Sequence, residues 1–133
     1  MQMHIGRPLA VLACVTAGLL AAPSRSDSTS AGQTVEPRVI NVVAKRYEFV
    51  PPAIEVIQGE RVRIVVTSGD GFHGFGIKKF DVSKEIARGE TVTIEFKPDV
   101  AGEFPILCTG FCGDGHEEMK GLLIVKAREA GQP

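Results

Sequence analysis

The sequence predicts an all-β fold, an antiparallel β-sandwich of about seven short strands, and three observations lead to it. Apolar and polar residues alternate with a period of two in several short segments, and turn-forming residues separate these segments. The 133 residues include 15 Gly, 8 Pro and no Trp, a composition that favours a turn-rich β architecture over a helix bundle. No glycine-rich phosphate loop and no strand–helix alternation occurs, which argues against a nucleotide-binding α/β fold.

Four predicted strands come first along the chain. Residues 39–44 (VINVVA) are rich in β-branched side chains, which favour strands. Residues 53–57 (AIEVI) alternate apolar and polar side chains, and the turn sequence QGE follows them directly. Residues 61–67 (RVRIVVT) repeat this alternation, which is typical of a half-buried strand. Residues 72–77 (FHGFGI) form a further extended segment, in which glycine allows other backbone to approach closely.

Three more strands follow in the second half of the chain. Residues 91–96 (TVTIEF) place valine, isoleucine and phenylalanine on one face. Residues 104–108 (FPILC) and 121–126 (GLLIVK) are short apolar runs that supply two further strands. The apolar residues of segment 80–88 follow neither a strand nor a helix period. A short helical turn is a possible structure there.

The charge and composition exclude several classes of protein. The chain has 15 Lys+Arg against 16 Asp+Glu, and this net charge of −1 argues against a nucleic-acid partner. Its 44% hydrophobic and 23% charged residues are ordinary for a globular protein and exclude wholesale disorder. The length corresponds to one domain.

The N-terminal segment is predicted to be a secretory signal peptide, residues 1–26. A positively charged start precedes an apolar run at residues 8–22, and a polar, serine-rich stretch follows. We place the cleavage between residues 22 and 26 and expect residues 27–37 to be a flexible leader. The apolar run is shorter than the ~20 residues of a spanning helix, although an uncleaved short anchor or a lipid anchor at Cys14 are alternatives.

Export would place the mature protein in the periplasm or an equivalent oxidising compartment. Membrane contact is expected only if the N-terminal segment is retained. Free thiols rarely persist in such a compartment without a reason, and the chain's three Cys are too few for a disulfide-stapled scaffold. The cysteines of the mature chain therefore need a separate explanation.

A single loop contains most of the residues that can perform chemistry. Residues 108–119 read CTGFCGDGHEEM, a C-x3-C-x3-H-x2-M spacing. Thiolate, imidazole and thioether groups are the ligands that soft and borderline metals prefer, copper above all. Gly113 and Gly115 allow the backbone to fold back, so that Cys112 and His116 can face one point.

The mature chain keeps few residues of these types elsewhere. Without residues 1–26 it contains only two Cys, two His and one Met, and four of these five lie in the loop. The fifth is His73, within the predicted strand at residues 72–77. Taken singly, His73 could be a core histidine, Met119 could fill a gap in the core, and Cys108 and Cys112 could form a disulfide. Together they predict a metal site.

Ligand softness distinguishes the candidate metals. Zinc gains little from a thioether. A mononuclear blue-copper site uses two His, one Cys and a weak Met, which leaves one cysteine without a role. Two thiolates, two imidazoles and a thioether suit two copper ions bridged by both sulfur atoms.

The chain resembles the copper A (CuA) domain of cytochrome c oxidase subunit II and of nitrous-oxide reductase, a branch of the cupredoxins. The loop matches the C-x3-C-x3-H-x2-M motif of this family, and residues 49–62 match an F-x-P-x-x-I-x-V-x-x-G-x-x-V run. The upstream His then follows an Asp and two further residues. The resemblance implies a Greek-key cupredoxin-like sandwich over residues 38–128, with residues 129–133 as a tail.

The same resemblance implies a ligand set for a binuclear copper centre. Cys108 and Cys112 would bridge both copper ions. His73 and Met119 would complete one copper, and His116 would complete the other.

The remaining implied ligand is the backbone carbonyl of Gly110. Oxidase subunits commonly have Glu at this position, where it also helps to bind magnesium, so the magnesium role is not expected here. The chain has no Trp and only Tyr47 in place of the aromatic cluster at which cytochrome c delivers electrons. The membrane helices usual ahead of the domain are reduced to the short apolar segment, and we expect a free-standing periplasmic protein.

The predicted function is one-electron transfer with a redox protein, such as a c-type cytochrome or a terminal oxidase or reductase. No small-molecule substrate and no catalytic residue are predicted, so the chain is not expected to be an enzyme by itself, although it could belong to an oxidase-type complex. Copper delivery, a mononuclear blue-copper site and thiol–disulfide chemistry are the alternatives. His116 would pass the electron, acidic side chains would attract a basic partner, and apolar side chains would limit water. The acidic residues are Asp114, Glu117 and Glu118, and the apolar ones are Phe72, Phe75, Phe111 and Leu122.

Overall fold

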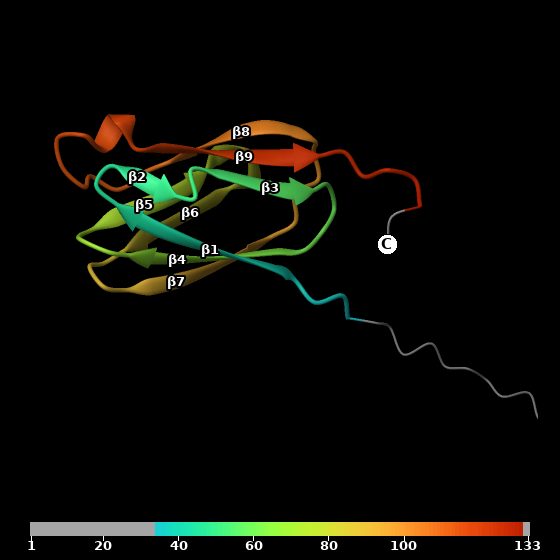
Figure 1. Ribbon diagram of the computed structural model, residues 1–133, viewed down its shortest axis with the longest axis horizontal. Coiled ribbons are helices and arrows are strands. Elements are labelled where there is room, and N and C mark those ends of the chain that lie inside the picture. Colours follow the sequence, from blue (N-terminus) through green and yellow to red (C-terminus); the bar gives the residue numbers. More distant parts are fainter. Residues whose placement is uncertain (1–33, 132–133) are drawn as a thin grey trace, which may run out of the picture. The chain divides into compact units, whose positions relative to one another are not determined.

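Two β-sheets packed face to face make up the described part of the chain (Figure 1). The computed structural model describes residues 34–131, so the predicted signal peptide and most of the predicted leader lie outside it. Among the described residues, no helix has the length and apolar character needed to cross a membrane.

One sheet has four strands in the order β2-β1-β4-β7, and the other has five in the order β3-β9-β8-β5-β6. The strands of the first sheet, in chain order, are β1 (Arg38–Lys45), β2 (Glu48–Val50), β4 (Val62–Ser68) and β7 (Thr91–Phe96). Those of the second are β3 (Ala53–Ile57), β5 (His73–Ile77), β6 (Val82–Ile86), β8 (Gly102–Leu107) and β9 (Lys120–Lys126). The predicted all-β sandwich is confirmed.

Two of the strand pairs are parallel, a feature that the sequence pattern did not predict. β1 pairs parallel to β4, with Arg38 opposite Val62, and β3 pairs parallel to β9, with Ala53 opposite Leu122. The chain reaches β4 only after crossing to the second sheet to form β3. β2 and β3 therefore separate β1 from β4 along the chain, and the two parallel strands are not joined by a direct hairpin, which would have made them antiparallel.

All seven predicted strands are present, and the structure adds β2 and β6. A 3-10 turn at Lys78–Phe80 overlaps the start of residues 80–88, where the sequence allows a short helical turn, and most of the rest of that segment forms the edge strand β6. In β6 only Val82 and Ile86 are buried, and the three residues between them are exposed. Two apolar residues four positions apart fit a helix as well as a strand, so this segment shows no diagnostic period.

The core lies between the two sheets and is made from alternate residues of each strand. In β4 every second side chain from Val62 to Ser68 is buried. The aromatic rings of Phe49 and Phe75 join the sheets with an edge-to-face contact, their centroids 5.4 Å apart. This packing fixes β5 against the first sheet, and β5 begins with the buried residue His73.

The predicted metal site lies among three of the loops at one end of the sandwich, the left end in Figure 1. They are the turn between β1 and β2, the segment between β4 and β5, and the loop between β8 and β9, which contains the 3-10 turn η2 (His116–Glu118). The loop between β8 and β9 is the one that the sequence singled out.

Candidate metal centre

His73 presents one ring nitrogen to the site and anchors the other. Its side chain is fully buried, and its Nε2 lies 2.7 Å from Oδ1 of Asp70. Its Nδ1 is also buried and has no hydrogen-bond partner within residues 34–131. Since an unpartnered buried nitrogen costs free energy, this atom is positioned to receive a ligand that residues 34–131 do not supply.

Cys108 and Cys112 place their sulfur atoms side by side. Cys108 directly follows β8, both residues are buried, and their Sγ atoms are 3.5 Å apart. A disulfide bond requires about 2.05 Å, and both residues are free thiols in the structure. The disulfide alternative is therefore not the arrangement found here.

The upstream histidine and the two cysteines converge from distant parts of the sequence. Gly74, which follows His73, is 34 positions from Cys108. One ligand atom from each of His73, Cys108 and Cys112 lies within 4.8 Å of the other two. The backbone N–H of Gly74 also donates a 3.4 Å hydrogen bond to Cys108 Sγ. β5 and the β8–β9 loop therefore face one another across the site.

The other three predicted ligands lie around the same sulfur pair. Met119 is buried, with its Sδ 3.8 Å from Cys112 Sγ, and His116 is half-buried, with its Nδ1 3.9 Å from the same sulfur. The carbonyl oxygen of Gly110 accepts a 3.1 Å hydrogen bond from the Cys108 thiol. All six groups that the resemblance implied as ligands are thus brought together at one point.

The close approach of β5 and the loop requires glycine at position 74. A Cβ atom at Gly74 would lie 2.3 Å from the backbone nitrogen of Gly110. A Cβ atom at Gly110 would in turn lie 2.5 Å from Cε1 of Phe72, whose ring covers that position. Any side chain at position 110 would therefore have to displace Phe72, which agrees with the absence of the oxidase glutamate from this chain.

The β1–β2 turn packs against the outside of the loop, a contact that sequence reasoning missed. Arg46 Nε donates a 3.1 Å hydrogen bond to the carbonyl oxygen of Cys112. The Tyr47 ring lies against Gly115, where a Cβ atom would be only 2.4 Å from Tyr47 Cδ2. Since 66 residues separate Arg46 from Cys112, no local spacing signals the contact.

Burial and neighbouring groups alter the acidity of two residues at the site. Burial, followed by the neighbouring Cys108, raises the pKa of the Cys112 thiol to about 11. The backbone amide of Arg46, followed by the His73 side chain, lowers the pKa of the Asp70 carboxyl group. Asp70 therefore stays ionised at neutral pH and can fix the orientation of the His73 ring.

The donor atoms fit a soft metal ion such as copper. Two thiols, a thioether and an imidazole nitrogen that has no partner in the described part of the chain face one buried point. Thiolate and thioether ligands favour copper over the harder divalent ions.

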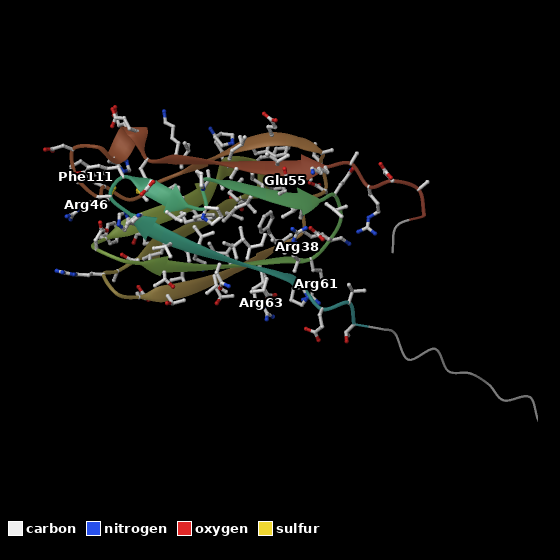
Figure 2. The ribbon with its side chains drawn as sticks, viewed as in Figure 1. Arg38, Arg46, Glu55, Arg61, Arg63 and Phe111 are labelled. Carbon is white, nitrogen blue, oxygen red and sulfur yellow. The ribbon has the colours of Figure 1, made fainter. Side chains whose placement is uncertain are left out.

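The predicted apolar surround is only partly buried. Phe75 belongs to the core, Phe72 is half-covered over Gly110, and 72% of the Phe111 surface is exposed. Phe111 nevertheless packs beside His116, with their ring centroids 5.8 Å apart. The predicted shielding of the site by Phe111 was therefore wrong for most of that ring, because its loop lies at the molecular surface (Figure 2).

The comparisons with known proteins agree with this geometry. A family model of the cupredoxin-like domain matches residues 10–125. Cytochrome c oxidase subunit 2 of Thermus thermophilus is 34% identical over 87 residues, which are 65% of this chain and 64% of that protein. Nitrous-oxide reductase of Ralstonia nicotianae is 35% identical over 74 residues, covering 53% of this chain and 12% of the reductase.

A solved structure gives the same fold. A chain of a heme-copper terminal oxidase dimer superposes with a TM-score of 0.61 and 26% identity, covering 67% of this chain and 65% of the other. The present chain spans less than two thirds of the length of the Thermus and Ralstonia proteins. With the family match extending over most of its residues, the chain belongs to the cupredoxin-like domain family.

Proposed function

We propose that this protein carries single electrons through a binuclear copper centre of the CuA type. The observation that carries the proposal is the buried pair of free thiols, 3.5 Å apart, beside an imidazole nitrogen that has no partner within residues 34–131. The similarity to cytochrome c oxidase subunit 2 supports a copper electron-transfer function.

The proposed copper ligands are the sulfur atoms of Cys108 and Cys112 and the four groups that lie around them. The thiolates of Cys108 and Cys112 would hold both copper ions. His73 and Met119 would complete the coordination of one ion, and His116 with the carbonyl of Gly110 would complete the other, which is consistent with their contacts to the sulfur pair. When bound, the two ions would supply one-electron redox chemistry.

The fold supports this role by keeping the ligands in place. His73 begins a fully buried strand, and Asp70 fixes its Nε2. The two ends of the loop are joined by a hydrogen bond from the Cys108 amide to the Met119 carbonyl, 3.3 Å long. A frame that moves little when the charge of the centre changes lowers the reorganisation that each electron transfer requires.

The surface beside His116 is the proposed contact with a redox partner. His116 is half-buried and lies next to the exposed ring of Phe111. The carboxylates of Asp114, Glu117 and Glu118 are exposed on the same loop. An apolar contact with acidic surroundings suits a basic redox protein such as a c-type cytochrome. Residues 1–26 remain our proposed export signal, and the periplasm remains the proposed compartment.

Copper titration of the protein followed by a redox titration tests the proposal. We expect two coppers per chain and one reversible electron per chain. Uptake of two coppers without a reversible redox wave, together with rapid exchange to a chelator, would instead indicate copper delivery. Uptake of a single copper would indicate a mononuclear blue-copper site.

A further inference from the structure

We propose that Arg46 is a positioning residue that joins the two halves of the metal centre. This inference rests on the proposed function. The first half is the pair of Asp70 and His73, the first residue of β5, and the second half is the loop that contains Cys112, His116 and Met119. Arg46 lies in the turn between β1 and β2 and belongs to neither half.

The backbone of Arg46 holds the first half. Its N–H donates a 2.9 Å hydrogen bond to Oδ2 of Asp70. The other carboxylate oxygen, Oδ1, is 2.7 Å from Nε2 of His73. One carboxylate therefore links Arg46 to the imidazole, and the direction in which His73 Nδ1 points depends on this link.

The side chain of Arg46 holds the second half. Its Nε donates a 3.1 Å hydrogen bond to the carbonyl oxygen of Cys112. The guanidinium group also lies against Gly71, because a Cβ atom at Gly71 would be 3.0 Å from Nη2 of Arg46. The side chain therefore bonds Cys112 through Nε and contacts the segment that precedes His73 through the end of its guanidinium group. Figure 2 shows Arg46 at the same end of the molecule as Phe111.

These contacts give Arg46 two effects on a copper centre. By fixing the Cys112 carbonyl, it limits the opening of the loop and so keeps the buried thiols away from solvent. Its positive charge next to the centre favours the reduced state, which contains one more electron, over the oxidised state. An arginine that served only as a surface residue would have neither effect.

Three variants separate these effects. Arg46→Met removes the hydrogen bond and the charge, and Arg46→Lys keeps the charge and a donor on a flexible stem. Neither change removes the backbone bond to Asp70. Arg63→Met is the control, because it also removes one arginine whose Nε donates a hydrogen bond, but from β4, where the half-buried Arg63 bonds Glu95 at 2.6 Å (Figure 2).

The first readout uses the metal-free protein and measures how fast a small thiol reagent modifies Cys108 and Cys112. We expect Arg46→Met to react about tenfold faster than the original protein, the size expected for loss of a charge-assisted hydrogen bond. Arg46→Lys should fall between them, and Arg63→Met should react at the original rate. Equal rates in all four proteins would overturn the positioning role.

The second readout is the reduction potential of the copper-loaded proteins. Arg46→Met should have a lower potential than the original protein, Arg46→Lys should be close to the original, and Arg63→Met should be unchanged. If the reduction potential fell equally in Arg46→Met and Arg63→Met, the cause would be the change in net charge. That result would contradict a specific effect of Arg46 on the centre. If the original protein binds no copper pair, the proposed function fails, while the thiol rates still decide whether Arg46 holds the loop.

Discussion

Asp70 holds His73 by one nitrogen and thereby directs the other into the metal centre. Asp70 Oδ1 is 2.7 Å from His73 Nε2, and the buried Nδ1 has no hydrogen-bond partner within the described residues. The carboxylate thus selects the ring orientation that the proposed copper ligand needs.

Replacement of this carboxylate tests the relationship. We expect Asp70→Ala to weaken copper binding by about 10–100-fold, the usual effect of losing a partner that orients a ligand. Asp70→Asn should bind more tightly than Asp70→Ala, because its amide oxygen can still accept from Nε2. The measurement is competition for Cu(I) with a chelator of known affinity. An unchanged affinity in Asp70→Ala would show that packing alone orients the ring.

The two cysteines should be equally necessary for a copper pair. Cys108→Ser and Cys112→Ser each remove one bridging sulfur, so each variant should bind fewer than two coppers and lose the shared-electron spectrum. Copper analysis together with visible spectroscopy measures both properties. A Cys108→Ser protein that retains a strongly coloured, reversible centre would favour the mononuclear blue-copper alternative.

The contact between Tyr47 and Gly115 should make this glycine intolerant of a side chain. A Cβ atom at position 115 would lie 2.4 Å from Tyr47 Cδ2, so Gly115→Ala should destabilise the metal-free protein by about 1–3 kcal/mol. Gly69→Ala is the control, because its Cβ would meet no atom closer than 3.8 Å. Chemical denaturation compares the two.

A second replacement shows whether the tyrosine ring is the cause. In the double variant Gly115→Ala with Tyr47→Ala, the added methyl group has room. It should therefore cost less free energy of unfolding in the Tyr47→Ala background than in the original protein. A cost that is the same in both backgrounds would mean that backbone conformation, rather than the ring, excludes a side chain at position 115.

Copper affinity should rise with pH. Burial and Cys108 raise the pKa of the Cys112 thiol to about 11, so this thiol is protonated at neutral pH in the metal-free protein. Copper binds the thiolate, and binding must therefore release this proton. Between pH 6 and 8, the affinity should increase by at least about tenfold per pH unit. Chelator competition at several pH values measures the slope, and a slope of zero would contradict thiolate binding.

Much of the site could be predicted because its residues are rare and close together in the sequence. Cys108, Cys112, His116 and Met119 lie within twelve residues, and few other residues of these types occur after residue 26. His73 required more, because only the pairing of β5 within the second sheet brings it to the loop. The resemblance to a known family supplied that long-range relationship.

The remaining features could not be predicted for physical reasons. Arg46 is a common residue type in a turn, and its hydrogen bond to Cys112 depends on how the two sheets pack. β6 has two buried residues four positions apart, and this spacing does not separate strand from helix. The parallel pairing of β1 with β4 joins strands that β2 and β3 separate along the chain, a relationship that local periodicity does not contain.

The electron paramagnetic resonance spectrum of the copper-loaded, oxidised protein tests the central claim most directly. If both sulfur atoms bridge two metal ions, a single unpaired electron will be shared equally by two copper nuclei in each chain. A spin confined to one copper nucleus, or full loading at one copper per chain, would contradict the binuclear centre.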